Sequence, residues 1–261
     1  RAIAKLALSY VVLTMVDRDD LLDGGADHVG RTVRRLHDLR EDLLVETLVG
    51  DFQGHMSAVD ACVAAEPDVF AHNVETVRRL TRTVRDVRSS YDQSLAVLAQ
   101  ARAKADAIGA TGGRRILTKS SIMVGLGESD AEVVEAMRDL RGVGVDVVTL
   151  GQYLRPSPKH HEIRRFVPPE TFVEYAREAE RLGFAYAASG PLVRSSYKAA
   201  EVFVRALLDP VARADDAGVE AALAERLAVA RREAARHAEL PADGGGAGAP
   251  AGLVPAARLL R

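Results

Sequence analysis

Cysteine is almost absent from this sequence of 261 residues, and tryptophan is absent altogether. The single cysteine excludes an internal disulfide and favours a reducing compartment. No apolar run approaches the roughly 20 residues that a transmembrane helix needs, and no signal peptide opens the chain. These absences predict a cytoplasmic protein that does not enter a membrane.

An excess of charge of one sign is also lacking. The 35 lysines and arginines are balanced by 37 acidic residues, which gives a net charge of −2. This balance provides no bulk attraction to nucleic acid or to an acidic membrane surface. The chain is 48% hydrophobic, enough to bury the core of one large α/β domain or two small ones.

Six apolar, β-branched runs alternate with helical segments. They are YVVLTMV (10–16), LLVETLVG (43–50), DVFAHNVE (68–75), ILTKSSIMVGL (116–126), VDVVTLGQY (145–153) and AYAASGPLV (185–193). Such alternation is typical of βα units around a parallel sheet. Because no phosphate-binding glycine motif follows any run, the pattern favours a barrel or partial barrel over a doubly wound sheet.

Two helices have well-marked ends. Ser129 and Glu132 form a capping box that predicts a helix start. A second helix is expected to start at Pro168-Pro169 and to stop at Gly183. We predict a barrel domain over residues 1–200, followed over 201–261 by an Ala/Arg-rich helical segment and a low-complexity tail.

Polar side chains accompany five of the six runs. They are VDRDDLLDGG (16–25), His72 with Asn73 and Glu75, Lys119 to Ser121, GQYLRPSPKHH (151–161) and RSSY (194–197). Functional residues in βα folds collect where the strands end and in the loops that follow. Each cluster alone is typical of a polar surface loop, but together they predict one mouth surrounded by all five.

Neither the histidine pair nor the cysteine predicts a metal site or a nucleophile. His160 and His161 are adjacent, so their rings point apart, and no ligand follows at the i+4 spacing of a helical zinc motif. A solvated or substrate-facing pair is favoured. Cys62 lies on an Ala/Val-rich helical face without an activating motif, which favours a packing role.

Several blocks, taken in order, resemble the lipoyl synthase family of radical S-adenosylmethionine (SAM) enzymes. The blocks, between about residues 5 and 200, are VDRDDLLDGG, DFQG, DVFAHNVETVRRL, YDQSL, TKSSIMVGLGESDAEVVEAMRDLR, VDVVTLGQYLRPSPKHH and ASGPLVRSSYKA. The resemblance implies an α/β fold, a partial (β/α)6 TIM-like barrel of the radical SAM type. It also implies that the first βα unit of that barrel is missing from this chain.

The resemblance further implies insertion of two sulfur atoms, at carbons 6 and 8 of an octanoyl group held on a carrier domain. One 4Fe-4S cluster reductively cleaves SAM to a radical, and a second, auxiliary cluster supplies the sulfur. No acid–base residue is assigned, because unactivated C–H bonds require cofactor chemistry. The implied partners are the octanoylated carrier and a reductant such as flavodoxin or ferredoxin.

Site residues carry over by position within the matching blocks. Ser196 matches a serine ligand of the auxiliary cluster, and Arg194 is expected beside it. Asp17, Asp19 and Asp20 are expected near the mouth, where they would meet the substrate peptide.

The SAM site carries over in the same way. Asn73 and Glu75 match the stretch that contacts SAM, and Arg155 is the expected partner of the SAM carboxylate.

The family's two cysteine triads, CxxxCxxC and CxxxxCxxxxxC, are absent, and Cys62 matches neither. We expect these six thiolates to lie upstream of Arg1 and this chain by itself to be inactive.

Two alternatives stay open. A degenerate paralogue without clusters would act as a binding module for an acylated carrier domain. An unrelated barrel enzyme, such as an aldolase, would use Lys119 as a Schiff-base lysine.

Overall fold

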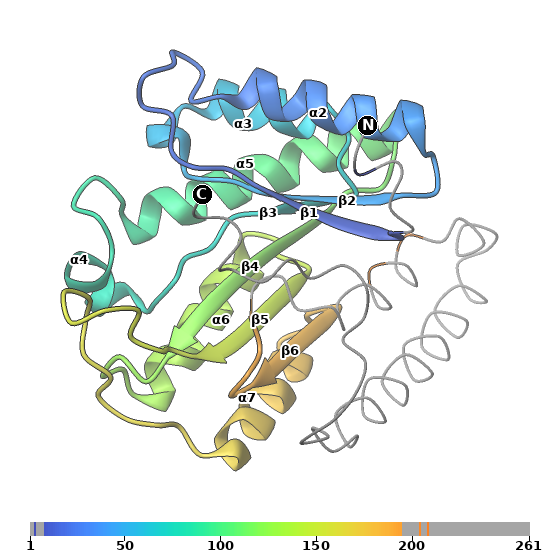
Figure 1. The fold of residues 1–261 in the computed structure, drawn as a ribbon. Coiled ribbons are helices and arrows are strands. Elements are labelled where there is room, and N and C mark those ends of the chain that lie inside the picture. Colours follow the sequence, from blue (N-terminus) through green and yellow to red (C-terminus); the bar gives the residue numbers. More distant parts are fainter. Residues whose placement is uncertain (1–2, 4–7, 195–203, 205–207, 209–261) are drawn as a thin grey trace, which may run out of the picture.

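A computed structural model describes residue 3, residues 8–194, residue 204 and residue 208. Its sheet has six strands, all parallel, in the order β1-β2-β3-β4-β5-β6. They are β1 Tyr10–Thr14, β2 Leu44–Leu48, β3 Val69–Ala71, β4 Leu117–Val124, β5 Val147–Gln152 and β6 Tyr186–Gly190. Every predicted run contains one strand, so the expected α/β partial barrel is confirmed (Figure 1).

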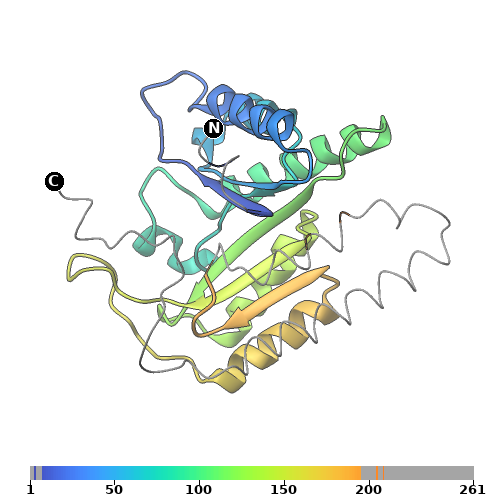
Figure 2. The same cartoon turned by 45° about the vertical axis from the view of Figure 1, so that its right-hand side comes forward.

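The helices follow the strands along the chain. They are α2 Ala26–Leu39, α3 Met56–Val63, α4 Thr81–Val84, α5 Tyr91–Ala110, α6 Asp130–Gly142 and α7 Pro169–Arg181, with 3-10 turns η1 Phe52–Gly54 and η2 Arg78–Leu80. Helices α2, α3 and α5 lie together along the part of the sheet that holds β1 to β3, and α6 and α7 lie along the rest (Figures 1 and 2). None of the described helices is long and apolar enough to cross a membrane.

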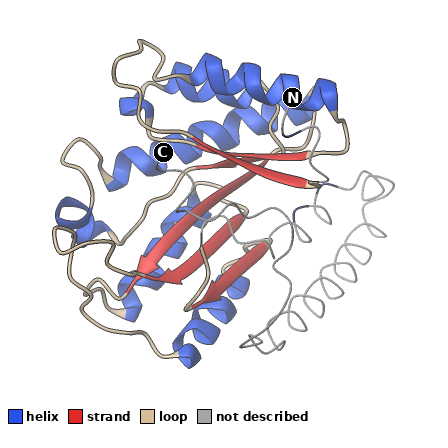
Figure 3. Ribbon diagram, viewed as in Figure 1, coloured by secondary structure: helices blue, strands red, loops and turns tan. Residues whose placement is uncertain are grey.

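Alternate residues of the strands face the helices and form the core. Val45 packs with α2, Phe70 with α3 and α5, and Ile122 and Leu150 with α6 and α7. Burial of this outer face by helices is what parallel sheets require (Figure 3). The other residues of the strands, among them Glu46 and Lys119, lie on the opposite, inner face.

Local sequence signals fix the two predicted helix ends. The Ser129 hydroxyl accepts from Glu132 N at 3.3 Å, and the Glu132 carboxylate accepts from Ser129 N at 2.8 Å. This is the expected capping box, and it starts α6. Helix α7 begins at Pro169, and Gly183 follows its end with a left-handed φ of +85°.

Strand β3 is shorter than the predicted run 68–75, because it ends at Ala71. The chain then turns, and Glu75 takes a left-handed φ of +66°. It still bonds to the next strand, since Glu75 N donates to Ser121 O at 3.1 Å and Met123 N donates to Glu75 O at 2.8 Å. The end of the run thus forms a loop that is held against β4.

The inner face contains a buried ion pair. Lys119 Nζ lies 2.8 and 2.9 Å from the two carboxylate oxygens of Glu46, and the Tyr10 hydroxyl donates to the same carboxylate. Glu46 is 0% exposed and Lys119 is 1% exposed. A Schiff-base lysine must present its amine to a substrate, so this pairing argues against the aldolase alternative.

The domain boundary expected near residue 200 stays a prediction. Beyond it the structure describes Val204 and Leu208 alone, and Val204 packs against Val69 and Leu117 on the inner face.

Replacing Lys119 by methionine should destabilise the fold by about 3–5 kcal/mol, because Glu46 would be left buried without a counter-charge. Urea denaturation measures the loss. The double variant Glu46→Leu/Lys119→Met should lose less than the single variant, since it removes both charges.

A matched control is the exposed pair of Arg177 and Glu174, whose charged atoms lie 2.7 Å apart. Arg177→Met should cost at most about 1 kcal/mol. A double variant that is no more stable than Lys119→Met would contradict the role given to the buried pair.

Candidate functional site

The candidate site lies where strands β1, β2 and β3 end. A cleft of about 400 Å³ is lined there by residues that follow each of these strands and by the segment after α4. A smaller pocket of about 180 Å³ adjoins it and shares Met15, Asp17, Gly50 and Asp51 with the cleft. The cleft lies within the range of about 300–1,000 Å³ that is usual for small-molecule sites.

Asn73 and Glu75 both line this cleft. The Asn73 side-chain amide donates to Glu75 Oε1 at 3.1 Å, and burial raises the pKa of the Glu75 carboxyl above its usual value. The left-handed backbone of Glu75 costs about 1–3 kcal/mol for a non-glycine residue, and the two bonds to β4 hold it in place. The structure brings these two predicted residues together, while their contact with SAM stays a prediction.

The three predicted aspartates separate into two groups. Asp17 lines both the cleft and the smaller pocket, and Asp19 lines the smaller pocket, where it forms an ion pair with Arg88. Asp20 instead accepts from Arg18 at 2.6 and 2.7 Å on the exposed side of the loop and lines neither of these two pockets. Only Asp17 and Asp19 therefore lie where a ligand of these pockets would meet them.

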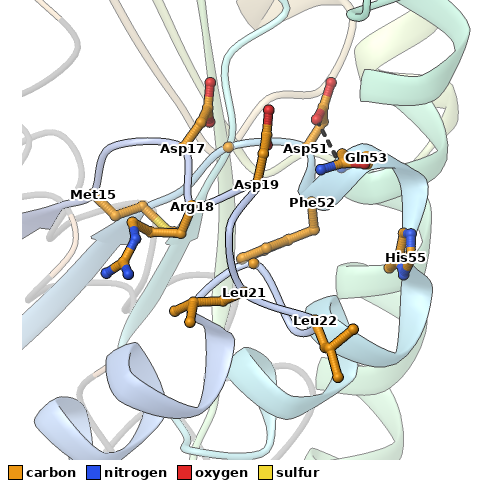
Figure 4. Close-up of a pocket in the computed structure, with 12 residues that line it drawn as sticks. Met15, Asp17, Arg18, Asp19, Leu21, Leu22, Asp51, Phe52, Gln53 and His55 are labelled. Atoms are coloured by element: carbon orange, nitrogen blue, oxygen red, sulfur yellow. Dashed lines mark hydrogen bonds between the residues drawn. The ribbon is translucent and has the colours of Figure 1, made fainter.

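Asp51 was not singled out from the sequence, yet it lines both pockets. Figure 4 shows Asp17, Asp19 and Asp51 with their carboxylates pointing to the same side. Asp51 Oδ1 accepts from Gln53 N at 3.0 Å, while its buried Oδ2 has no hydrogen-bond partner among the described residues. A buried acceptor of this kind is suited to a donor or a cation brought by a ligand.

A second group that sequence reasoning missed joins His72, Ser94 and Arg85. His72 Nδ1 lies 3.0 Å from Val49 O, and its Nε2 lies 2.9 Å from Ser94 Oγ. Arg85 donates to the same Ser94 oxygen at 2.7 Å and lines the cleft. Burial lowers the pKa of His72 to about 4, so its ring is neutral at pH 7. His72 belongs to a polar cluster noted in the sequence, but nothing local indicates its link to Ser94 and Arg85.

Arg155 does not line the cleft. Its Nε donates to His160 O at 2.9 Å, and a second nitrogen donates to Pro158 O, so the guanidinium holds its own exposed loop. The structure therefore gives no support to its predicted role as partner of the SAM carboxylate, because its guanidinium lies away from the cleft lining and bonds to its own loop.

The histidine pair has separate local partners. His160 Nδ1 lies 2.9 Å from Ser157 Oγ, and His161 Nδ1 lies 2.8 Å from Glu162 O. This loop does not contribute to the cleft, so the prediction of one mouth lined by all the polar clusters is not met here.

The Lys119–Ser121 cluster lies within β4, as expected of residues carried by the fourth strand, but it does not line the cleft that the polar clusters were predicted to share. Ser120 faces the helices and accepts from Val74 N at 3.2 Å, which helps to hold the Asn73–Glu75 loop. Met123, further along β4, is the residue of this strand that reaches the cleft.

The last polar cluster lies at the limit of the described residues. Arg194 donates to Val193 O at 2.9 Å, and Ser196 lies outside the described residues, so its predicted ligand role is not tested. A Cβ on Gly151 would meet Val193 O at 2.2 Å, which shows that the loop after β6 presses against β5.

The residues of this chain do not fit a 4Fe-4S cluster. Such a cluster is normally held by several cysteine thiolates, and the sequence has one cysteine. Cys62 is 0% exposed and packs between helices, and burial raises its thiol pKa to about 12. The packing role predicted for Cys62 is confirmed. Within the described part of the chain, no group of three or more His, Cys, Asp or Glu side chains is placed to hold a metal ion.

Comparisons with known proteins give a consistent family. No family model matches the chain. The chain is 65% identical to the lipoyl synthase of Sorangium cellulosum over 100% of its own length and 76% of that protein. It is 56% identical to the lipoyl synthase of Anaeromyxobacter dehalogenans, with 78% of the chain and 66% of that protein aligned.

A plant relative is more distant. Lipoyl synthase 1, chloroplastic, of Populus trichocarpa is 51% identical over 79% of the chain and 53% of that protein. The chain thus spans between about half and three quarters of the length of these relatives. Among solved structures, methylornithine synthase aligns over 66% of this chain and 48% of its own, with 16% identity and a TM-score of 0.49.

The neutral His72 should make stability depend on pH. Its folded pKa of about 4 lies below the ordinary histidine pKa of 6.5, so the unfolded chain binds the extra proton between these values. Stability should therefore fall, by up to about 3 kcal/mol, as the pH drops from about 6.5 to about 4. Urea denaturation across this range measures the slope.

The variant His72→Gln should lose the part of that slope due to the buried ring. The variant His28→Gln, which changes an exposed histidine, should keep the slope of the parent chain. Equal slopes in the parent and in His72→Gln would show that the ring does not titrate as proposed.

Proposed function

The chain belongs to the lipoyl synthase family, and on that premise we propose that its cleft binds S-adenosylmethionine for sulfur insertion into a protein-bound octanoyl group. The observation that carries the proposal is the convergence of Asn73 and Glu75, which match the SAM-contacting stretch, in one cleft at the strand ends. The 65% identity to a lipoyl synthase over the whole chain supports it.

The charges of the cleft suit this ligand. SAM carries a sulfonium and an ammonium group, which require acceptors or negative charge, and a carboxylate, which requires donors. Glu75, Asp17 and Asp51 supply carboxylate oxygens, and Asn73 and Arg85 supply N–H donors. Complementary charge of both signs fixes the orientation of a ligand as well as its affinity.

The chemistry of the intact enzyme would come from its cofactors. Bound SAM and two 4Fe-4S clusters would supply the radical that attacks an unactivated C–H bond and the sulfur inserted at carbons 6 and 8. This chain has one cysteine, so thiolates beyond its own would be required to hold the clusters. We propose that this chain by itself holds no cluster and is inactive in sulfur insertion.

The remaining assignments follow from the same family. An octanoylated carrier domain is the proposed substrate, and flavodoxin or ferredoxin is the proposed type of reductant, in the cytoplasm. Asp17 and Asp19 line the pockets at the mouth, where they would meet the carrier peptide around the acylated lysine. In this proposal the chain's own residues bind and orient SAM and the substrate, and the cofactors carry out the reaction.

The single buried cysteine also favours a second candidate function, that of a cluster-less module that binds an acylated carrier domain. The two candidates differ in the ligand of the cleft. Binding of SAM is required by the first and is not expected of the second.

Anaerobic reconstitution of this chain with iron and sulfide should give no visible absorbance of an iron–sulfur cluster, because the only thiol is buried. Cys62→Ala is the matched control and should retain as little iron as the parent chain. A stable cluster spectrum accompanied by formation of 5′-deoxyadenosine would contradict the proposed inactivity.

Isothermal titration calorimetry should detect saturable binding of SAM to the parent chain. Asn73→Ala and Glu75→Gln should each weaken it by about tenfold, the effect of losing one good polar contact to a charged ligand. Glu170→Gln, a change at an exposed glutamate in the first turn of α7, should leave it unchanged. If the parent chain binds the carrier domain but shows no saturable binding of SAM, the second candidate replaces the first.

A further inference from the structure

Resting on the proposed function, we propose that Arg85, held in place by Ser94 and His72, binds the carboxylate of SAM. This assigns to Arg85 the role that the sequence resemblance gave to Arg155. The juxtaposition of Arg85 with Asn73 and Glu75 in one cleft carries the inference.

Arg85 differs from the arginines around it in its partners. Nearby arginines are engaged by carboxylates: Arg78 with Asp92 and Asp139, Arg79 with Glu132, and Arg88 with Asp19 and Asp86. Arg85 donates to a neutral hydroxyl, Ser94 Oγ, and no carboxylate of the described residues forms an ion pair with it. A guanidinium has five N–H donors, so Arg85 retains donors for a ligand carboxylate.

Two carboxylates near Arg85, in the chain or in the cleft, have other hydrogen-bond partners. Asp86, its neighbour in the chain, accepts from Arg88 Nε at 2.8 Å. Glu75 accepts from the Asn73 amide at 3.1 Å, and burial raises the pKa of its carboxyl, a rise that the positive charge of Arg85 offsets only in part. The cleft therefore contains a positive charge, on Arg85, that a bound anion would neutralise.

The direction of each hydrogen bond explains how Arg85 is positioned. Val49 O can only accept, so His72 carries its proton on Nδ1 and its Nε2 must accept. The Ser94 hydroxyl then donates its single proton to Nε2, which leaves its oxygen free to accept from Arg85. His72 follows β3 and Ser94 lies in α5, so the guanidinium is anchored to two well-packed elements.

This anchoring matters because a guanidinium binds a carboxylate best with two parallel N–H···O bonds. An arginine that is already oriented loses less side-chain entropy when such a pair forms. Arg155 lacks both features, since it does not line the cleft and two of its nitrogens donate to the backbone of its own loop.

The test compares two ligands that differ only in the carboxylate, SAM and decarboxylated SAM, by calorimetry. The parent chain should bind SAM at least about tenfold more tightly than the decarboxylated form, the usual gain from a charge-assisted pair. The ratio of the affinity for SAM to the affinity for decarboxylated SAM should fall to near one in Arg85→Gln. It should persist in Arg155→Gln, the matched control.

Arg85→Lys should give an intermediate ratio, because a lysine keeps the charge but not the forked geometry. Ser94→Ala should reduce the ratio without weakening the binding of decarboxylated SAM, since Ser94 is a positioning residue. A general structural defect would instead weaken both ligands equally, and far-UV circular dichroism with urea midpoints identifies such variants. Selective loss of the ratio in Arg85→Lys and Ser94→Ala then supports the proposal even if Arg85→Gln folds poorly.

Other outcomes overturn the inference. An undiminished ratio in Arg85→Gln, or a ratio lost in Arg155→Gln, would return the carboxylate to Arg155 or to another group. If the parent chain binds both ligands but shows no preference for SAM, the inference fails while the proposed function stands. If the parent chain binds neither ligand, the proposed function fails first and the inference fails with it.

Discussion

The parallel hydrogen-bonded register of the six strands is the constraint on which the rest of the structure depends. Because every strand runs in the same direction, the loops that follow them leave the sheet at one edge. Asp17, Asp51 and Asn73 come from three different loops, yet they line one cleft for this reason. Helices on the outer face remove the apolar surface from water and leave the inner face available for polar groups.

Polar groups on the inner face and at its rim are held before any ligand arrives. The Glu46–Lys119 pair is buried, and its desolvation is offset by close contacts that include the Tyr10 hydroxyl. Glu75 is kept in a left-handed conformation by two backbone bonds to β4. Strain and buried charge of this kind concentrate at functional sites, where the fold over-determines the geometry.

The cleft and the cluster chemistry of the family place different demands on the chain. Binding of a small, mixed-charge ligand needs side chains of both signs around one cavity, and the described residues provide them. Holding an iron–sulfur cluster needs several thiolates, and these 261 residues contain one, which is buried in the helical layer. In the proposed function, recognition and radical generation are therefore separate: this chain's own residues would bind the ligand, and clusters held by further thiolates would generate the radical.

Sequence alone determined what depends on near neighbours: the existence of the six strands, the capping box of α6 and the ends of α7. Periodicity and capping are local properties, and the distinctive blocks identify the family without reference to packing. Tertiary structure decided which distant groups meet. Lys119 pairs with Glu46, 73 residues away, and His72 meets Ser94 across 22 residues. Sheet register and loop paths set these contacts, and they place Arg85 in the cleft and Arg155 outside it.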